Sequence, residues 1–389
     1  MGFDVIVVGA GLWGSACARH LSAMGARVAL VGPAEPQDAA AHNGVFASHY
    51  DEARITRRLD NSRDWALFAD AAMRRYAEIE TLGGQKFFHK VGALMAGPES
   101  GVGSNYMRDT AAVAQAESIA HDALRGAALQ ERFPFFDFPD GILGLFEKEG
   151  GWINPRAHVA AEIGAGVANG VTLVQDEVVE VEDIGNGVTV RCAGGETLQA
   201  DKVVVAGGAF SKAPGLLPDP VPLQVYARTI AFVEIDAAEA ERLKDMPSVV
   251  YFYPDGAGDC YVLPPVLYPD GKTYLKIGGD PTDVELSTVS EMKEWFRGDG
   301  DPKAADYMVA QLFKLMPNLA SQGVSHNSCV TSFTPRSTPL IYGQSERVYA
   351  VTGGNGAGAK CADEIGRLGA LKVLGKPLPE NRYQTDFLL

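Results

Sequence analysis

The sequence has few positively charged residues, and its cysteines are not regularly spaced. Its 389 residues carry 34 lysines and arginines against 49 acidic residues, a formal net charge of −15. Such a surface disfavours nucleic acid and anionic membranes as partners, although a few local arginines can still bind a small anionic substrate. The five cysteines are scattered and show no metal-ligand spacing. An odd, dispersed set fits a reducing compartment better than a disulfide framework, and it predicts no metal site.

Long apolar runs, tandem repeats and low-complexity linkers are also missing. No apolar run approaches the ~20 residues that a membrane-spanning helix needs. The first residues lead directly into an apolar strand, without a basic segment or a cleavage site. We therefore expect a cytoplasmic protein with no membrane partner. With 46% apolar and 21% charged residues, the composition is that of a soluble globular protein, and the length allows two structural units with sizeable cores.

Residues 1–31 combine an apolar run, a glycine-rich turn, a helical pattern and a second apolar run. Gly9-Ala10-Gly11-Leu12-Trp13-Gly14 follows the first run directly, and residues 15–24 have helical spacing. A G-x-G-x-x-G between a strand and a helix predicts a dinucleotide site. Gly9 would permit the tight turn, Gly11 the approach of a pyrophosphate and Gly14 close packing of helix and strand. The alternative, an ordinary glycine-rich turn of an α/β protein, fits this context less well.

The second strand of this unit ends without the carboxylate that usually binds the adenosine ribose. Val28-Ala29-Leu30-Val31 is followed by Gly32, and the nearest acidic residue is Glu35. Either Glu35 reaches back to the ribose, or backbone groups hold it.

The rest of the chain reads as a mixture of helices and strands. Helical spacing predicts helices over 60–82, 111–133, 155–167, 287–316 and 362–374, with Asp60-Asn61-Ser62 and Asn154 as candidate caps and breaks at Gly126 and 298–301. Strands are predicted over 87–95, 171–174, 178–181, 188–192, 198–206, 221–235, 249–264, 273–278 and 348–352.

The fold class predicted from these elements is α/β, or α+β overall. The N-terminal strand, the strand at 202–206 and the strand–glycine–helix unit at 348–374 look like parts of one sheet. We predict a discontinuous dinucleotide-binding domain from residues 1–83, 146–216 and 322–389. Residues 84–145 and 217–321 would form an inserted substrate domain on an antiparallel, mixed sheet.

Three cationic residues and one cysteine are candidates for chemistry, each with an ordinary alternative. Arg54 and Arg57 follow the nucleotide unit three residues apart, and a guanidinium is a natural bidentate partner of a carboxylate. Their spacing alone fits two solvated arginines at a helix start better. Lys276, between two apolar residues on a predicted strand, suits a buried cation or the polar face of an amphipathic strand. Without further information, Cys329 is most simply interpreted as a buried thiol.

Four segments read together resemble the flavin-dependent amine oxidases that include D-amino acid oxidase and glycine oxidase, and among them the monomeric sarcosine oxidases and N-methyltryptophan oxidases. These segments are 3–14, 48–57, 274–278 and 328–360, and the likeness runs through nearly the whole chain. It implies a Rossmann-like FAD-binding domain with an inserted substrate domain.

The resemblance also implies roles for individual residues. Arg57 and Lys360 would pair with a substrate carboxylate, Arg54 would lie against the flavin ring, and Lys276 would activate oxygen through a water. Cys329, about thirty residues before Lys360, aligns with the cysteine that binds the flavin covalently through a thioether, while Cys361 is expected in the core. The implied cofactor-binding residues are Gly9, Gly11, Leu12, Trp13, Gly14, Ser48, His49, Arg54, Val178, Gly207, Cys329, Gly356, Gly358 and Lys360; Lys276, Arg57 and Lys360 would be catalytic, and Arg57, Lys360, Tyr50 and Asp280 would bind substrate.

The chain departs from the sarcosine oxidase pattern at four positions. Gly32 replaces the ribose-binding acid, Tyr50 stands in place of a histidine, Thr331 in place of a tyrosine and Asp280 in place of a histidine. The last three shape the substrate pocket, so the resemblance supports the cofactor better than the substrate. An acidic Asp280 could pair with a substrate ammonium.

The resemblance implies oxidation of a secondary amine, most simply an N-alkyl or cyclic amino acid. Hydride transfer to flavin N5 would give an imine that hydrolyses, and O₂ would be reduced to hydrogen peroxide, in a monomer or homodimer. Alternatives are a dehydrogenase with another electron acceptor, an oxidase of glycated, pipecolate-like or aminophosphonate substrates, and a flavin-binding subunit without turnover. An NAD(P)H-dependent reductase is disfavoured because no second clear G-x-G-x-x-G is present.

Overall fold

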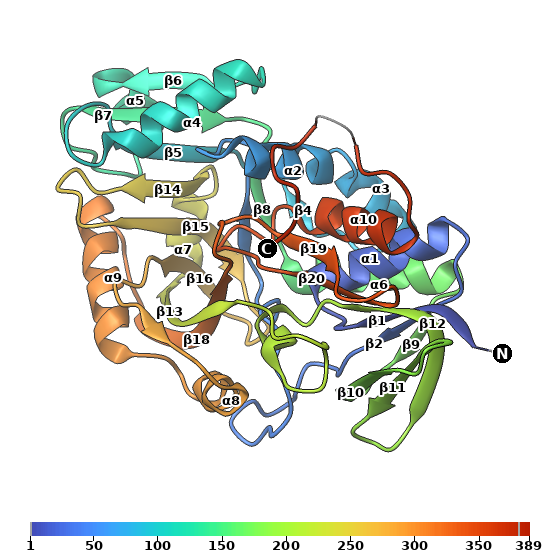
Figure 1. The fold of residues 1–389 in the computed structure, drawn as a ribbon. Helices are drawn as coiled ribbons and strands as arrows, with labels where there is room; N and C mark the ends of the chain where they lie inside the picture. Colours follow the sequence, from blue (N-terminus) through green and yellow to red (C-terminus); the bar gives the residue numbers. More distant parts are fainter. Residues whose placement is uncertain (1, 380–381) are drawn as a thin grey trace.

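Two large β-sheets and a small third one organise the molecule. The computed structural model describes residues 2–379 and 382–389. An eight-stranded sheet lies beside the N-terminal and C-terminal helices, a nine-stranded sheet forms the other half, and a three-stranded sheet lies between them (Figure 1). No helix within these two ranges is long and apolar enough to cross a bilayer.

The eight-stranded sheet is built around parallel strands that end at a common edge. β1 (Phe3–Val8) pairs in parallel with β2 (Val28–Val31) and β12 (Thr197–Val205), and β12 pairs in parallel with β20 (Val348–Thr352). The loops that follow these strands therefore meet at one edge, which is where ligands bind in open α/β sheets. The remaining strands are β9 (Thr172–Val174), β10 (Val178–Asp183), β11 (Val188–Cys192) and β19 (Leu340–Gly343).

Three helices cover one face of this sheet. α1 (Leu12–Ala23) packs against both α6 (Pro155–Ala168) and α10 (Ala362–Val373) (Figure 1). β1 and β2 consist almost wholly of buried apolar residues because both faces of a parallel sheet are covered. The side chain of Asn154 accepts a hydrogen bond from the Ala157 amide at 2.9 Å, so this predicted cap is confirmed. α2 (Arg63–Met73) and α3 (Tyr76–Gly83) lie nearby.

The nine-stranded sheet is centred on the long strand β13 (Gln224–Ile235). It pairs antiparallel with β16 (Thr273–Gly278) and with β18 (Gly323–Phe333), the strand that carries Cys329. α9 (Pro302–Leu315) covers the outer face of the sheet, with which it forms one apolar core. The other elements of this half are β5 (Ala93–Pro98), α4 (Ser104–Ala116), β6 (Asp122–Arg125), α5 (Gly126–Arg132), β7 (Ile142–Glu147), α7 (Ala237–Arg242), β14 (Ser248–Phe252), β15 (Asp259–Leu267), β17 (Val284–Glu285) and α8 (Val289–Arg297); the 3-10 helix η1 (Gly208–Lys212) follows β12.

The three-stranded sheet holds the arginine-bearing segment. β3 (Arg54–Thr56) pairs with β8 (Gly151–Ile153), which also pairs with β4 (Phe88–His89). Arg54 and Arg57 therefore lie on and directly after a strand rather than at a helix start, and the interpretation as two solvated helical residues is wrong.

Several predicted elements differ from the observed ones. The helix predicted over 60–82 is the pair α2 and α3, and the apolar pattern could not show the break because it continues across it. The helix predicted over 111–133 contains β6, and Gly126 begins α5 instead of breaking a helix. The strand predicted over 87–95 is divided into β4 and β5. Ser62 occupies the N-cap position of α2 but makes no capping hydrogen bond through its side chain.

β18 was not predicted, because its polar residues hide the strand pattern. It hydrogen-bonds to β13 in the nine-stranded sheet, although the predicted boundaries put residues 322–389 in the dinucleotide-binding domain. The division of the chain into two domains remains a proposal.

A buried network of charges joins the helices of the eight-stranded sheet. Asp363 at the start of α10 accepts hydrogen bonds from Arg19, His20 and Arg75, and Arg19 also pairs with Glu162 of α6. Burial opposes ionisation of Asp363, but the hydrogen bond from His20 and the charges of Arg75 and Arg19 hold its pKa well below the ordinary value. The helices are therefore locked together by ion pairs as well as by apolar packing.

Asp363→Asn should destabilise the protein strongly, because it removes the only charge that faces both Arg19 and Arg75 in the described chain. We expect a loss of about 3 kcal/mol or more in the free energy of unfolding, measured with urea. The exposed pair Arg27–Asp4 provides the control, and Asp4→Asn should have little effect. Since the folded pKa of Asp363 is depressed, its contribution is present above the unfolded pKa of about 3.9 and is lost as the pH falls towards the folded value. An equal effect of the two substitutions at neutral pH would contradict the structural role.

Candidate active site

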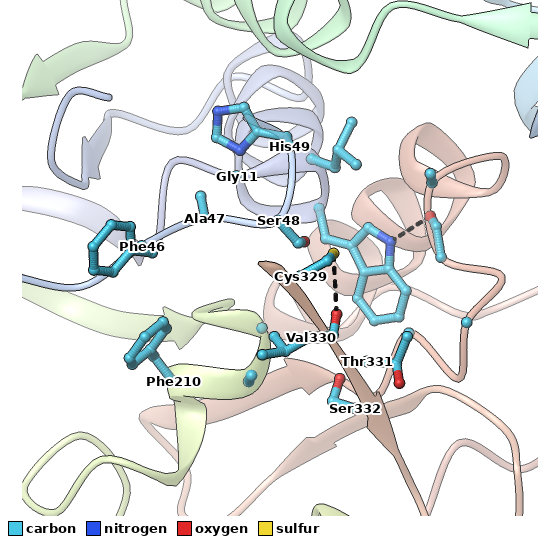
Figure 2. A pocket seen from close by; sticks show the side chains of 18 of the residues that line it. Gly11, Phe46, Ala47, Ser48, His49, Phe210, Cys329, Val330, Thr331 and Ser332 are labelled. Carbon is cyan, nitrogen blue, oxygen red and sulfur yellow. Dashed lines mark hydrogen bonds between the residues drawn. The ribbon is translucent and has the colours of Figure 1, made fainter. Parts of the chain in front are cut away.

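A cavity of about 700 Å³ lies where the edge of the eight-stranded sheet meets the nine-stranded sheet. Gly9, Gly32, Gly207 and Gly353, which follow β1, β2, β12 and β20, all line it. Figure 2 shows the segment 46–49 facing Cys329 to Ser332 of β18 across the pocket. The topology of the parallel strands thus brings distant parts of the chain to one site.

The glycine-rich turn fits a pyrophosphate. No side chain caps the first turn of α1, and Gly11 at its N-cap lines the cavity, so the free backbone N–H groups of this turn are available to an anion. A Cβ atom on Gly14 would lie 1.8 Å from the Gly9 carbonyl oxygen, which explains why helix and turn can pack here only with glycine. The indole Nε1 of Trp13 donates to the Gly358 carbonyl at 2.9 Å and ties this turn to the C-terminal glycine turn.

Gly32 is explained by packing rather than by ligand binding. A Cβ atom there would lie 2.5 Å from the Ala10 amide nitrogen, so no larger residue can stand at this strand end. Glu35 does not line the cavity; it is paired with Arg156 at 2.7 and 2.8 Å. Of the two alternatives for the ribose, this geometry favours backbone groups.

Cys329 is the one free thiol with access to the cavity. It is half-buried, whereas Cys17, Cys192, Cys260 and Cys361 are buried. Its Sγ lies 3.7 Å from the Val330 carbonyl oxygen (Figure 2). The same sulfur lies 4.0 Å from a guanidinium nitrogen of Arg54. Burial raises the pKa of Cys361 to about 12, as expected for an inert core thiol.

Lys276 is a buried cation, so the interpretation as a solvated residue on a polar face is wrong. Its side chain is 1% exposed and donates to Asp51 at 2.5 Å and to the Ala53 carbonyl at 2.8 Å. Burial and the nearby charge of Arg54 lower the pKa of Lys276, whereas the adjacent Asp51 carboxylate favours the protonated amine. Arg54 pairs with the same carboxylate. Lys276 lies behind the cavity wall, over the ring of Tyr261 at 5.6 Å.

Arg57 and Lys360 converge on a single carboxylate oxygen. Asp60 Oδ2 lies 2.6 Å from Lys360 Nζ and 3.2 Å from Arg57 Nη1. Burial disfavours the ionised form of Asp60, but the charges of Lys360 and Arg57 keep its pKa below the ordinary value. The cluster therefore carries two positive charges and one negative charge at the cavity wall.

The remaining wall comes from the nine-stranded sheet and α4. Phe252 stacks on Tyr106 with ring centroids 4.2 Å apart, and both rings line the cavity together with Asp259. The hydroxyl of Tyr106 faces Arg57, and burial raises its pKa to about 12. Tyr50, Thr331 and Asp280, the positions that depart from the sarcosine oxidase pattern, also line the cavity.

Asp280 uses both carboxylate oxygens within the protein. One accepts from the Thr229 amide at 2.8 Å, and the other accepts from the amide and hydroxyl of Thr282 at 3.0 and 2.6 Å. His49 is kept neutral because burial, together with Arg156 and Arg54, lowers its pKa to about 3.

Sixteen of the eighteen residues singled out from the sequence line this one cavity, and two lie behind its wall. Gly14 lies inside the first turn of α1, and Lys276 behind Ala53 and Tyr261. No role at the site is predicted from the sequence for Asp51, Tyr106 or Asp259, and Asp60 is predicted as a helix cap. Buried cations need counterions, so the acidic residues close to Arg54 and Arg57 were a usable signal for Asp51 and Asp60.

Comparisons with known proteins agree with this geometry. The profile of the FAD dependent oxidoreductase (DAO) family matches residues 4–370. The monomeric sarcosine oxidase of Bacillus sp. (strain NS-129) is 32% identical over 243 residues, which cover 61% of this chain and 60% of that protein. The N-methyl-L-tryptophan oxidase of Yersinia pestis (strain Pestoides F) is 25% identical over 389 residues, covering 97% of both chains.

A solved structure shows the same fold. NikD, an unusual amino acid oxidase essential for nikkomycin biosynthesis, superimposes with a TM-score of 0.76 at 22% identity, over 95% of this chain and 93% of that one. The Rossmann-like FAD-binding domain with an inserted substrate domain, predicted from the resemblance, is confirmed. The match over nearly the whole chain, joined to a cavity built at the ends of β1, β2, β12 and β20, makes this chain a member of the FAD dependent oxidoreductase family.

Proposed function

We propose that this protein is an FAD-dependent oxidase of a secondary amine, an N-alkyl or cyclic amino acid, with O₂ as the electron acceptor. The observation that carries the proposal is the convergence of Arg57 and Lys360, from distant parts of the chain, in the wall of the same cavity as the glycine turn of α1. The relatives that act on sarcosine and N-methyl-L-tryptophan support an N-alkyl amino acid as the substrate class.

The residues at one end of the cavity suit FAD. The turn of Gly9 and Gly11 would receive the pyrophosphate, and the turns at Gly207 and 356–358 and the segment 48–49 would enclose the rest of the cofactor. Bound FAD would supply the redox chemistry, taking a hydride from the carbon beside the amine nitrogen and passing the electrons to O₂ to give hydrogen peroxide. We propose that Cys329 holds it through a thioether, because this thiol alone among the five reaches the cavity.

Arg57 and Lys360 would bind and orient the substrate carboxylate. Their two positive charges and the single charge of Asp60 leave one positive charge, enough to attract one carboxylate. Fixing the carboxylate also fixes the neighbouring C–H bond, and such positioning is the main contribution that a protein makes when the cofactor takes the hydride.

A dehydrogenase that uses another acceptor is the second candidate, and one observation favours it. A lone cation beside the flavin would stabilise the superoxide formed during O₂ reduction. In this chain the charge of Lys276 is compensated by Asp51 at 2.5 Å, although Arg54 shares the same carboxylate and leaves an excess of one positive charge. That excess leads us to keep the oxidase as the first proposal.

If the flavin is attached covalently to Cys329, its yellow colour should stay with the protein pellet after acid precipitation. Cys329→Ser should release the flavin into the supernatant, where its absorbance is measured. Cys361→Ala is the matched control, because that thiol is buried away from the cavity, and it should keep the colour in the pellet. A colourless wild-type pellet would remove the role of Cys329.

Lys276→Met should slow the reaction of reduced flavin with O₂ by roughly 10²-fold or more, because it removes the excess positive charge. Stopped-flow measurements of anaerobic flavin reduction by substrate should show a much smaller change. If both half-reactions lose the same factor, Lys276 supports the site structurally and does not activate oxygen. A slow oxidative half-reaction in the wild type would instead favour the dehydrogenase.

Arg57 and Asp60 should have opposite effects on carboxylate binding. Arg57→Ala should weaken binding of a small redox-inert carboxylate such as acetate by about tenfold or more, since a charge-assisted hydrogen bond is lost. Asp60→Asn should tighten it, because the competing charge beside Lys360 disappears while the amide oxygen can still accept from Ser62. Binding is measured by titrating the flavin absorption spectrum. Unchanged affinity in Arg57→Ala would exclude the carboxylate clamp.

A further inference from the structure

The charged side chains that line the cavity have, with one exception, an ion-pair or hydrogen-bond partner within the protein. Arg57 and Lys360 share Asp60, and Arg54 pairs with Asp51. Arg228 pairs with Asp283 at 2.7 Å. Glu177 binds Lys293 at 3.3 Å and the Val45 amide at 3.0 Å. Asp280 accepts hydrogen bonds from the uncharged groups of Thr229 and Thr282.

Asp259 is the exception. It lines the cavity, yet within residues 2–379 and 382–389 its carboxylate has neither an ion-pair nor a hydrogen-bond partner. The residue is the first of β15 and lies opposite Phe252 of β14. The side chain is exposed at the cavity wall, although the protein atoms around it raise its pKa by desolvation, an effect that the charge of Arg57 offsets only in part. A ligand that fills the cavity would displace the water around this exposed carboxylate, which would then gain most from a cation that the ligand itself carries.

The walls between Asp259 and the Arg57 cluster suit a hydrocarbon spacer. Phe252, Tyr106 and Val250 line the same part of the cavity, and Tyr106 connects them with Arg57. A ligand that reaches both charged ends would therefore lie along aromatic and aliphatic side chains.

A cation bound by Asp259 would not be the nitrogen that reacts. Oxidation of a C–N bond to an imine needs the lone pair of the reacting nitrogen, so this nitrogen must be neutral when the hydride leaves. A carboxylate paired with it would stabilise the ammonium form and oppose the reaction. The cationic partner must then be a second nitrogen that stays protonated throughout.

We propose that Asp259 binds a distal ammonium group of the substrate, so that the preferred substrate is a basic N-alkyl amino acid. Its carboxylate would lie at Arg57 and Lys360, its reacting secondary amine in the centre and its cation at Asp259. This inference rests on the proposed amine oxidase function and names the substrate class for it.

Two ligands that differ only in the distal charge test the inference. Nα-methyl-L-lysine carries the ammonium, and Nα-methyl-L-norleucine has the same backbone and chain without it. Each is titrated anaerobically into the holoenzyme, with binding followed by the shift in thermal unfolding temperature and reduction by the bleaching of the flavin. We expect the lysine derivative to bind about tenfold more tightly in the wild type, since a charge-assisted hydrogen bond to Asp259 is gained in a cavity from which the ligand has displaced water.

Asp259→Asn should abolish this preference, and the norleucine derivative should bind at least as tightly as in the wild type, because a negative charge that acts on Arg57 is removed. Because the Asp259 carboxylate has no hydrogen-bond or ion-pair partner among the residues that the structure describes, the variant should unfold at about the same temperature as the wild type. Asp255→Asn is the matched control, since it removes the same charge from the loop before β15, outside the cavity, and keeps an acceptor for the Ala257 amide. It should retain the full preference.

The possible outcomes distinguish the role of Asp259 from the proposed amine oxidase function. Equal affinity of the wild type for the two ligands, or an equal loss for both in Asp259→Asn, would overturn the assignment of Asp259, even where both bleach the flavin. Tighter binding of the lysine derivative without bleaching by either ligand would support Asp259 and contradict the proposed oxidase. Failure of both ligands to bind would overturn the inference, because the charged probe must bind if Asp259 recognises it.

Discussion

The structure depends on the pairing of buried cations by carboxylates from one short segment. Residues 51–60 supply Arg54 and Arg57, and they also supply Asp51 and Asp60, which neutralise Lys276 and Lys360. An isolated buried charge costs several kcal/mol, so these cations can stand beside an apolar cavity only with such partners. The segment thereby connects the nine-stranded sheet, through Lys276, with the loop after β20, through Lys360.

Much of the cofactor end could be predicted because backbone geometry fixes it. The turn from Gly9 to Gly14 needs close approach of main chains, and residue type in a strand–turn–helix context reveals that need directly. The parallel strands were also visible as apolar runs, and their shared edge follows from topology. Cys329 and Lys360 were placed by resemblance rather than by pattern, since the polar strand β18 gave no readable signal of its own.

The substrate end was less predictable, because its chemistry lies in contacts between side chains far apart in the sequence. Asp60 looked like a helix cap, yet its Oδ2 turns towards Lys360, while only its Oδ1 accepts from the Ser62 amide. Asp259 begins a strand after an exposed turn and gave no sign of facing a cavity. Asp280 is predicted to pair with a substrate ammonium and lines the cavity, and its oxygens also accept hydrogen bonds from Thr229 of β13 and from Thr282. The role of an acidic side chain in this region can be interpreted only when its hydrogen-bond and ion-pair partners are known.

The cofactor end and the substrate end of the cavity differ in how readily their residues can be replaced, and this difference allows the substrate to vary within one fold. The cofactor end uses main-chain groups of the eight-stranded sheet, which tolerate few substitutions, as Gly14 and Gly32 show. The substrate end uses side chains on β14, β15 and α4, where a single residue can change the charge of the wall without moving the backbone. With one excess positive charge at Arg57, Lys360 and Asp60 and one negative charge at Asp259, the two charged ends cancel. A substrate end with charges separated in this way favours a ligand with separated charges over a simple anion.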